Sequence, residues 1–129
     1  MIKGKFLHNN ITVLDLEKSM EFYDKALGFK EKRRIVNEGN FIIVYLWDGV
    51  SDYELELTWY NDRTKPYDLG ENEIHMAFQV EDAAAAYQVH KAMGVVIYEN
   101  KDMNLYFIGD PDGYWCEVLG VDRKKPVIP

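Results

Sequence analysis

A short pattern that occurs twice constrains the fold of this chain more than any other feature. The pattern His-x4-Val-x-Asp begins at His8 and begins again at His75. A glycine suited to ending a helix follows at nearly the same offset, since Gly28 comes 20 residues after His8 and Gly94 comes 19 residues after His75. Two unrelated segments would rarely share both the pattern and the offset. The sequence therefore indicates one module written twice.

Each copy predicts the same order of a strand, a helix and three further strands. In the first copy we expect a strand at 5–13, a helix that starts at Leu16 after the cap Asp15 and ends at Gly28, and strands at about 30–37, 40–48 and 52–60. In the second copy we expect a strand at 73–80, a helix at 83–93 between Asp82 and Gly94, and strands near 95–99, 104–108 and 114–120. The polar segment 61–72, which contains Pro66 and Gly70, predicts a linker.

These elements predict a single α+β domain built from paired β-α-β-β-β modules. Module one spans about 1–60, the linker 61–72 and module two about 73–121, and a short tail spans 122–129. A chain of 129 residues is long enough to bury its own core, so no metal is needed merely to fold it.

The composition of the chain indicates which partners we do not expect and in which cellular compartment we expect the protein. The net charge of -7 provides no broad positive field, so we expect neither nucleic acid nor a membrane as a partner. Cys116 is the only cysteine, which excludes an intramolecular disulfide and favours a reducing compartment. No apolar run approaches the roughly 20 residues of a membrane helix, and the N-terminal residues have no apolar signal core. We therefore expect a cytoplasmic protein.

The alternation of side chains along a strand predicts two faces for the segment 54–58. Glu54, Glu56 and Thr58 fall on one face, whereas Leu55 and Leu57 fall on the other. The leucine face requires an apolar cover such as a helix. The glutamate face is then left as the polar face of the sheet.

Glu117 is the corresponding residue near the end of the second copy. It shares a strand face with Trp115 and Leu119, and a carboxylate among large apolar neighbours needs a partner. A divalent cation bound by two imidazoles and two carboxylates would meet that need. Mixed nitrogen and oxygen ligands suit zinc, nickel, cobalt or iron better than magnesium or calcium. Taken singly, His8 is more often a partly buried core histidine and Glu56 a solvated strand residue, so the prediction depends on the set of four.

The third histidine does not share this placement. His90 lies within the predicted second helix, and we expect it to have a surface role.

Several segments together resemble one known family. These are His8–Ser19, Phe22-Tyr23, Leu27-Gly28-Phe29, Glu56-Leu57-Thr58, Ile74-His75, and the turn Asp110-Pro111-Asp112-Gly113 followed by Tyr114-Trp115-Cys116-Glu117. Over nearly the whole chain they resemble glyoxalase I, the lactoylglutathione lyases of the vicinal oxygen chelate superfamily. The resemblance implies a curved mixed sheet around a metal site. The ligands that it implies are His8, Glu56, His75 and Glu117.

The resemblance also implies a reaction and a cofactor. The family isomerises the hemithioacetal of methylglyoxal and glutathione to a lactoyl thioester by proton transfer through an enediolate. Glu117 would be the principal base, and Glu56 a metal ligand that could also act as a second base. The short chain is similar to the compact bacterial form, which favours one Ni2+ per site, with Zn2+ or Co2+ as alternatives. The same likeness implies a homodimer, in which one site could be built from one chain or from two.

The chain departs from the family at the substrate contacts. Thr12 occupies a position where the family typically has an arginine that holds a glutathione carboxylate, and Asn61 lies one residue out of the expected register. The loop that usually covers the site is reduced to 100–104, which contains Lys101 and Met103. We expect these four residues to contact substrate. Two alternatives stay open: another metal-dependent superfamily enzyme such as an acyl-CoA epimerase, or an antibiotic-binding protein of the same fold without catalysis.

Overall fold

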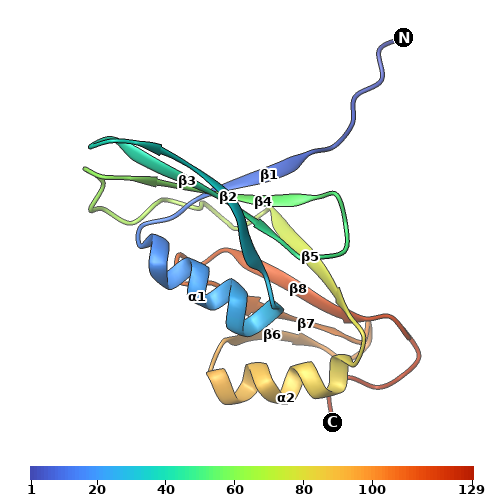
Figure 1. Cartoon of the computed structure of the whole chain (residues 1–129). Helices are drawn as coiled ribbons and strands as arrows, with labels where there is room; N and C mark the ends of the chain where they lie inside the picture. Colours follow the sequence, from blue (N-terminus) through green and yellow to red (C-terminus); the bar gives the residue numbers. More distant parts are fainter. The chain divides into compact units, whose positions relative to one another are not determined.

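The computed structural model describes all 129 residues and divides into two compact units, unit 1 at residues 1–67 and unit 2 at residues 68–129. Each unit contains one helix and one four-stranded sheet in the order β-α-β-β-β (Figure 1). The predicted fold class is therefore confirmed. The boundary between the units falls inside the segment 61–72 that was expected to be a linker, and that the two units act as one domain stays a prediction.

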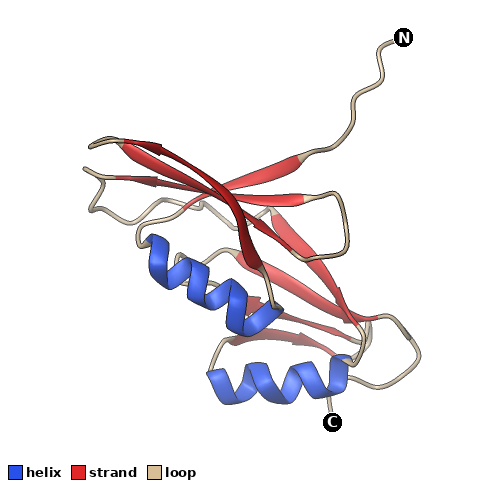
Figure 2. Ribbon diagram, in the orientation of Figure 1, coloured by secondary structure: helices blue, strands red, loops and turns tan.

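Unit 1 contains β1 (His8–Thr12), α1 (Leu16–Leu27), β2 (Lys30–Asn37), β3 (Phe41–Trp47) and β4 (Glu54–Tyr60). Its sheet has the strand order β1-β4-β3-β2, in which β1 pairs parallel to β4 and the other pairs are antiparallel. Helix α1 packs along one face of this sheet, as the ribbon in Figure 2 shows. The opposite face is left open within the unit.

Unit 2 repeats this arrangement with β5 (His75–Val80), α2 (Ala83–Met93), β6 (Val96–Asn100), β7 (Leu105–Gly109) and β8 (Trp115–Gly120). The strand order is β5-β8-β7-β6, and β5 pairs parallel to β8. The first strand of each module lies at the edge of its sheet, and the last strand of the module lies next to it. Because the two strands are parallel, their N-terminal ends are side by side.

Both helices begin and end where the sequence predicts. The carboxylate of Asp15 accepts a hydrogen bond from the backbone N–H of Lys18 at 3.1 Å, and that of Asp82 accepts one from Ala85 at 3.0 Å. Gly28 and Gly94 end the helices in the left-handed region, with φ of 71° and 72°. A side chain with a Cβ atom is strained in that conformation, so the two glycines are required by the backbone.

The core of each unit lies between its helix and its sheet. In unit 1, Leu55 and Leu57 are 3% and 0% exposed, as the alternation predicts, and Phe22 and Tyr23 of α1 are buried with them. At roughly 1.5–3 kcal/mol for each large apolar side chain, this burial is the main term that holds α1 on the sheet. The sheet that carries Glu56 on its polar face is therefore held in place by a packed core on its other face.

His90 of α2 is buried in unit 2, so the expected surface role is wrong. Its side chain is 1% exposed, and its ring nitrogen Nδ1 lies 2.7 Å from the hydroxyl of Tyr106. His90 lies three residues after Tyr87 and seven after Ala83, and all three are buried. This spacing puts His90 on the face of α2 that meets the sheet.

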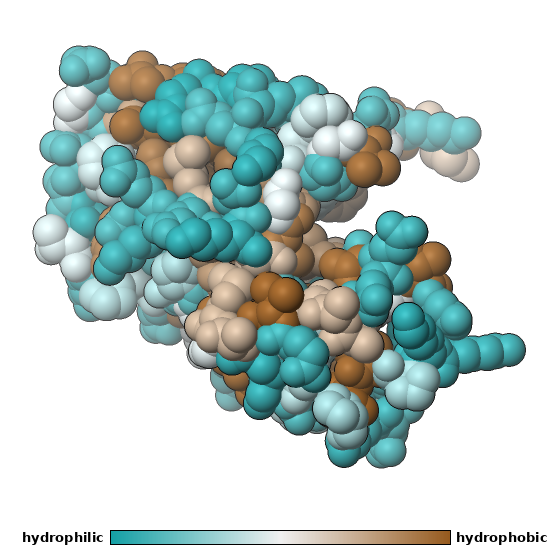
Figure 3. Space-filling model, turned by 60° about the horizontal axis from the view of Figure 1, so that its bottom comes forward, coloured by the Kyte–Doolittle hydropathy of each residue, from teal (hydrophilic) through white to brown (hydrophobic).

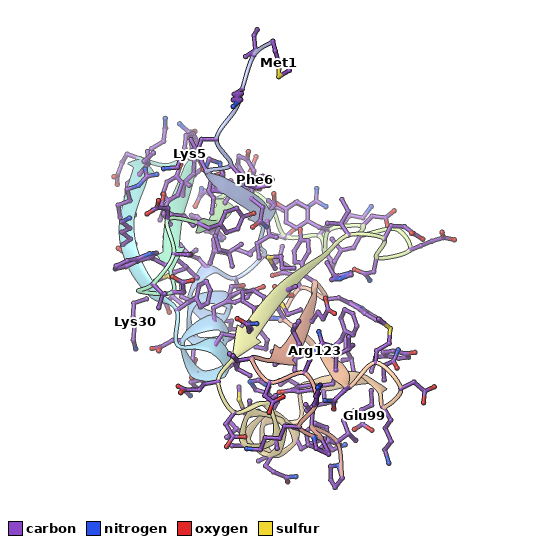
Figure 4. The ribbon with its side chains drawn as sticks, turned by 90° about the vertical axis from the view of Figure 1, so that its right-hand side faces the viewer. Met1, Lys5, Phe6, Lys30, Glu99 and Arg123 are labelled. Carbon is purple, nitrogen blue, oxygen red and sulfur yellow. The ribbon has the colours of Figure 1, made fainter.

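Three strands begin two or three residues later than expected, and one of them is β5, which was expected from residue 73 and begins at His75. The first strand was expected from residue 5 and begins at His8, and the segment from Met1 to Phe6 extends away from the sheet (Figure 4). The strand expected from residue 52 begins at Glu54, because a tight loop follows β3. In that loop Asp48 accepts hydrogen bonds from the backbone N–H groups of Val50 and Ser51, each at 2.8 Å.

The exposed face shown in the space-filling view of Figure 3 is mostly polar, with apolar side chains among the hydrophilic ones. Strand β2 is an edge of its sheet and is exposed along its whole length, which includes Lys30, Lys32, Arg33 and Arg34. Neither helix is long and apolar enough to cross a membrane.

Candidate metal centre

The first predicted ligand pair lies on β1 and β4 of unit 1. These neighbouring strands run parallel, and Asn10 lies opposite Glu56. His8 lies two residues before Asn10, so its side chain is on the same face of the sheet as that of Glu56. The Nε2 atom of His8 is 3.5 Å from Oε2 of Glu56. The side chains are 35% and 14% exposed, so both polar ends are accessible from the open face of the sheet.

The second pair occupies the equivalent strands of unit 2. The Nε2 atom of His75 on β5 lies 3.2 Å from Oε2 of Glu117 on β8, with side-chain exposures of 43% and 19%. The two pairs therefore have the same donor types, nearly the same separation and similar exposure. Each combines an imidazole nitrogen with a carboxylate oxygen, which is a donor set that suits a transition metal ion such as nickel, cobalt or zinc.

Each unit brings together two of the four predicted ligands. No group of three or more histidine, cysteine, aspartate or glutamate side chains that could hold a metal ion occurs in the structure. The convergence of His8, Glu56, His75 and Glu117 on one cation thus stays a prediction.

Glu56 has two further hydrogen-bond donors. Asn10 Nδ2 donates to Oε1 of Glu56 at 2.8 Å and is itself within 2.5 Å of Oγ1 of Thr58. The hydroxyl of Tyr45 also donates to the Glu56 carboxylate, and this hydrogen bond, together with burial, raises the pKa of Tyr45. The carboxylate of Glu56 is consequently held from several sides.

A cationic group lies beside this pair on the same face of the sheet. The guanidinium of Arg33 stacks 3.5 Å from the centre of the Tyr45 ring, and its Nη2 atom is 3.2 Å from Oε1 of Glu54. Lys32 lies 3.9 Å from the second oxygen of Glu54. The sequence reasoning did not single out Arg33, although its place opposite Tyr45 follows once the register of β2 and β3 is known.

Aromatic rings lie on the same face of the sheet as Glu117, and Phe107 is directly opposite it. The His75 ring meets Phe107 edge-on at 5.0 Å between ring centres, and Trp115 lies 5.3 Å from Phe107 and 6.1 Å from Tyr98. These rings come from β6, β7 and β8 and form an apolar surface on the same face as Glu117. The apolar setting predicted for this carboxylate is confirmed.

The turn before β8 sets the start of the strand that carries Glu117. Asp110 is 7% exposed, and its carboxylate accepts hydrogen bonds from the backbone N–H groups of Asp112 at 2.9 Å and Tyr114 at 2.8 Å. Gly113 has φ of 91°, a conformation that glycine adopts without strain. The turn predicted for residues 110–113 is therefore present, and a buried carboxylate holds it.

The four predicted substrate contacts lie at three places. Thr12 is on β1, with its hydroxyl 3.4 Å from Oδ1 of Asn10, and Asn61 directly follows β4. Lys101 and Met103 lie in the turn between β6 and β7, where Met103 is 61% exposed. Their contact with a substrate stays a prediction.

Comparison with known proteins identifies the family. Residues 5–118 match the model of the Glyoxalase/Bleomycin resistance protein/Dioxygenase superfamily. A lactoylglutathione lyase of Neisseria meningitidis serogroup A is 36% identical over 124 residues, which cover 89% of each protein. A probable lactoylglutathione lyase of Synechocystis is 33% identical over 128 residues, which cover 92% of this chain and 97% of that protein.

Two solved structures give the same result. The trypanothione-dependent glyoxalase I of Leishmania major superposes with a TM-score of 0.81 at 32% identity, covering 92% of this chain and 87% of that one. Maize glyoxalase I superposes with a TM-score of 0.75 at 25% identity, covering 88% of this chain and 43% of that one. The chain therefore belongs to the glyoxalase I (lactoylglutathione lyase) family, a family of lyases within the Glyoxalase/Bleomycin resistance protein/Dioxygenase superfamily.

Proposed function

We propose that this protein is a metal-dependent glyoxalase I that isomerises the hemithioacetal of methylglyoxal and glutathione to a lactoyl thioester. The observation that carries the proposal is the pair of matching His–Glu contacts, His8 with Glu56 and His75 with Glu117, at equivalent places in the two units. Relatives named lactoylglutathione lyase support the same reaction.

One divalent cation per site, with Ni2+ favoured and Zn2+ or Co2+ as alternatives, would be held by His8, Glu56, His75 and Glu117. Both pairs fit such an ion, because each offers one nitrogen and one oxygen donor on a face that is open within its unit. When bound, the cation stabilises the negative charge that develops on the substrate oxygens.

Glu117 is the base in this proposal. Its carboxylate takes the proton from the substrate carbon that carries the sulfur, and returns it to the adjacent carbon that was the ketone. One C–H bond breaks and another forms, and the hydroxyl proton of the first carbon passes to the oxygen of the second. The reaction is therefore an isomerisation that needs no outside oxidant or reductant. The rings of Phe107 and Trp115 beside the carboxylate limit the access of water, which favours return of the same proton.

We propose that the thiol is glutathione, which carries carboxylates. Thr12 and Asn61 of unit 1 and Lys101 and Met103 of unit 2 are the proposed contacts, with Lys101 as the anion partner. The Leishmania major relative is described as trypanothione-dependent, so the thiol differs between members of the family. Comparison of glutathione with other cellular thiols is therefore part of the test.

The test combines metal analysis with an assay of hemithioacetal loss. Protein purified without added metal is expected to contain a stoichiometric divalent ion, and removal of the ion with a chelator should abolish turnover that Ni2+ or Co2+ then restores. Glu117→Gln should lower kcat by about 10²–10⁴-fold, the usual contribution of a general base. Glu38→Gln, in an exposed turn, is the matched control. Near-normal activity of Glu117→Gln would remove that residue from the mechanism, and a metal-loaded protein inactive with every thiol would refute the activity.

We also propose that the protein is a homodimer. Whether a site takes its two His–Glu pairs from one chain or from two can be tested by mixing His8→Ala/Glu56→Ala with His75→Ala/Glu117→Ala. If each site draws on two chains, random reassortment should restore about a quarter of the wild-type activity, because half the dimers are mixed and each contains one complete site. If each site belongs to one chain, the mixture stays inactive.

A further inference from the structure

We propose that Asn10 and Tyr45 are positioning residues that hold Glu56 in one orientation as a fixed metal ligand, so that proton transfer is left to Glu117. The inference rests on the proposed function and goes beyond it, because it explains why two carboxylates in repeated surroundings take different roles. It derives from the places where the two modules differ.

The strand register identifies the residues that flank each glutamate. In unit 1, Glu56 lies opposite Asn10 on one neighbouring strand and opposite Tyr45 on the other. In unit 2, Glu117 lies opposite Ala77 and opposite Phe107. Directly paired residues project on the same side of a sheet. The repeat thus places an amide and a hydroxyl around one carboxylate, and a methyl group and a phenyl ring around the other.

The donors on Glu56 are themselves fixed. The amide of Asn10 lies within hydrogen-bonding distance of both Glu56 and Thr58, which restricts its rotation. Tyr45 is 6% exposed, its ring is covered by the guanidinium of Arg33, and the ring of His8 meets it edge-on at 5.7 Å. Rotation of the Glu56 carboxylate would therefore break two hydrogen bonds to groups that cannot follow it.

Glu117 lacks this support. Ala77 has no donor, Phe107 has no hydroxyl, and His75 is the side chain within hydrogen-bonding distance of the carboxylate. A carboxylate with fewer hydrogen-bond donors is freer to move between two substrate carbons. The difference between the modules consequently assigns the fixed role to Glu56 and the proton-carrying role to Glu117.

The first test removes the donors from Glu56. Tyr45→Phe and Asn10→Ala give unit 1 the surroundings that unit 2 has, and each should raise the dissociation constant for Ni2+ by about 10–100-fold, the usual effect of losing a hydrogen bond to a ligating residue. The affinity is measured by competition with a chromophoric chelator. Tyr53→Phe is the matched control, because its hydroxyl contacts Asn9 rather than a proposed ligand.

The second test gives donors to Glu117. Ala77→Asn and Phe107→Tyr place an amide and a hydroxyl opposite this carboxylate, and Ala77 is exposed, so the larger side chain has room. We expect kcat with saturating metal to fall at least about tenfold while the metal affinity is kept or increased. A purely structural role for these positions would not separate the two quantities.

Wild-type metal affinity in both Tyr45→Phe and Asn10→Ala would overturn the inference, and so would full kcat in both Ala77→Asn and Phe107→Tyr. Tyr45→Phe removes one oxygen atom and keeps the ring packed, so it gives an answer even if Asn10→Ala does not fold. If the wild-type protein binds no metal, the proposed function fails. If the wild type binds metal and turns over but its variants are unchanged, only the inference fails.

Discussion

Removal of the Asp110 carboxylate tests how the turn before β8 stabilises unit 2. This side chain is 7% exposed and accepts two backbone hydrogen bonds, from Asp112 and Tyr114. Both hydrogen bonds are accepted by Oδ1, so Asp110→Ala removes both of them from two N–H groups in a half-buried turn. Strand β8 begins at Trp115, two residues after this turn, so the strand that carries Glu117 loses its support at one end.

The expected loss follows from the two hydrogen bonds. A hydrogen bond to a charged group contributes about 1.5–3 kcal/mol, and water can partly replace the lost acceptor, so Asp110→Ala should lower the free energy of unfolding by about 3 kcal/mol. This corresponds to a decrease of roughly a hundredfold in the ratio of folded to unfolded protein. Asp110→Asn keeps one acceptor oxygen and should cost about 1 kcal/mol.

Urea unfolding followed by circular dichroism measures these differences. Asp68→Ala is the control, because the Asp68 carboxylate accepts a single backbone hydrogen bond, from Gly70 at 2.9 Å, and the residue is exposed. Its loss should stay within about 0.5 kcal/mol. Equal midpoints for Asp110→Ala and Asp68→Ala would refute the argument from the buried carboxylate.

Three further predictions concern other parts of the chain. Tyr106→Phe removes the hydroxyl that meets His90 in the core of unit 2 and should lower the free energy of unfolding by about 1–3 kcal/mol; Tyr98→Phe, at an exposed position, should change it little. Burial opposes ionisation of Asp48, but hydrogen bonds from the backbone N–H groups of its loop lower the pKa of this carboxyl below its usual 3.8. The ionised carboxylate therefore stabilises the folded protein fully above about pH 3.8. This stabilisation is lost as the pH falls through the lower pKa of the folded state. Unfolding of Asp48→Asn should therefore depend less on pH below about 4 than unfolding of the wild type, and parallel curves would contradict this. Thr12→Arg should lower KM for the glutathione hemithioacetal roughly tenfold in steady-state kinetics, and an unchanged KM would show that the anion is held elsewhere.

Local chemistry predicts the elements of this fold well. Asp15 and Gly28 each act through neighbours within five residues, so the limits of α1 can be inferred from sequence alone. The start of β4 was predicted two residues too early, because the loop after β3 is closed by Asp48 and extends further than its glycine suggests.

The candidate site is less predictable, because its detail depends on strand register. His8, Glu56, His75 and Glu117 follow from the repeat and from the family resemblance. That Asn10 and Tyr45 contact Glu56 requires knowing which residues lie opposite one another on β1, β4 and β3, and no local pattern specifies this. The burial of His90 was available from its spacing to Tyr87 and Ala83, which shows that a polar residue on a helix must be assessed by its face as well as by its type.

The charged outer strand β2 has a consequence for how the protein behaves when it is concentrated. An open strand edge invites pairing with the same edge of another molecule, which is the first step of fibril growth. Four of the eight residues of β2 are basic, and each forms an ion pair with a neighbouring carboxylate, Asp24, Glu31 or Glu54. Pairing with a second molecule would have to remove these charged groups from water, which opposes self-templated assembly through this edge, although Ile35 and Val36 on the same strand would otherwise favour it.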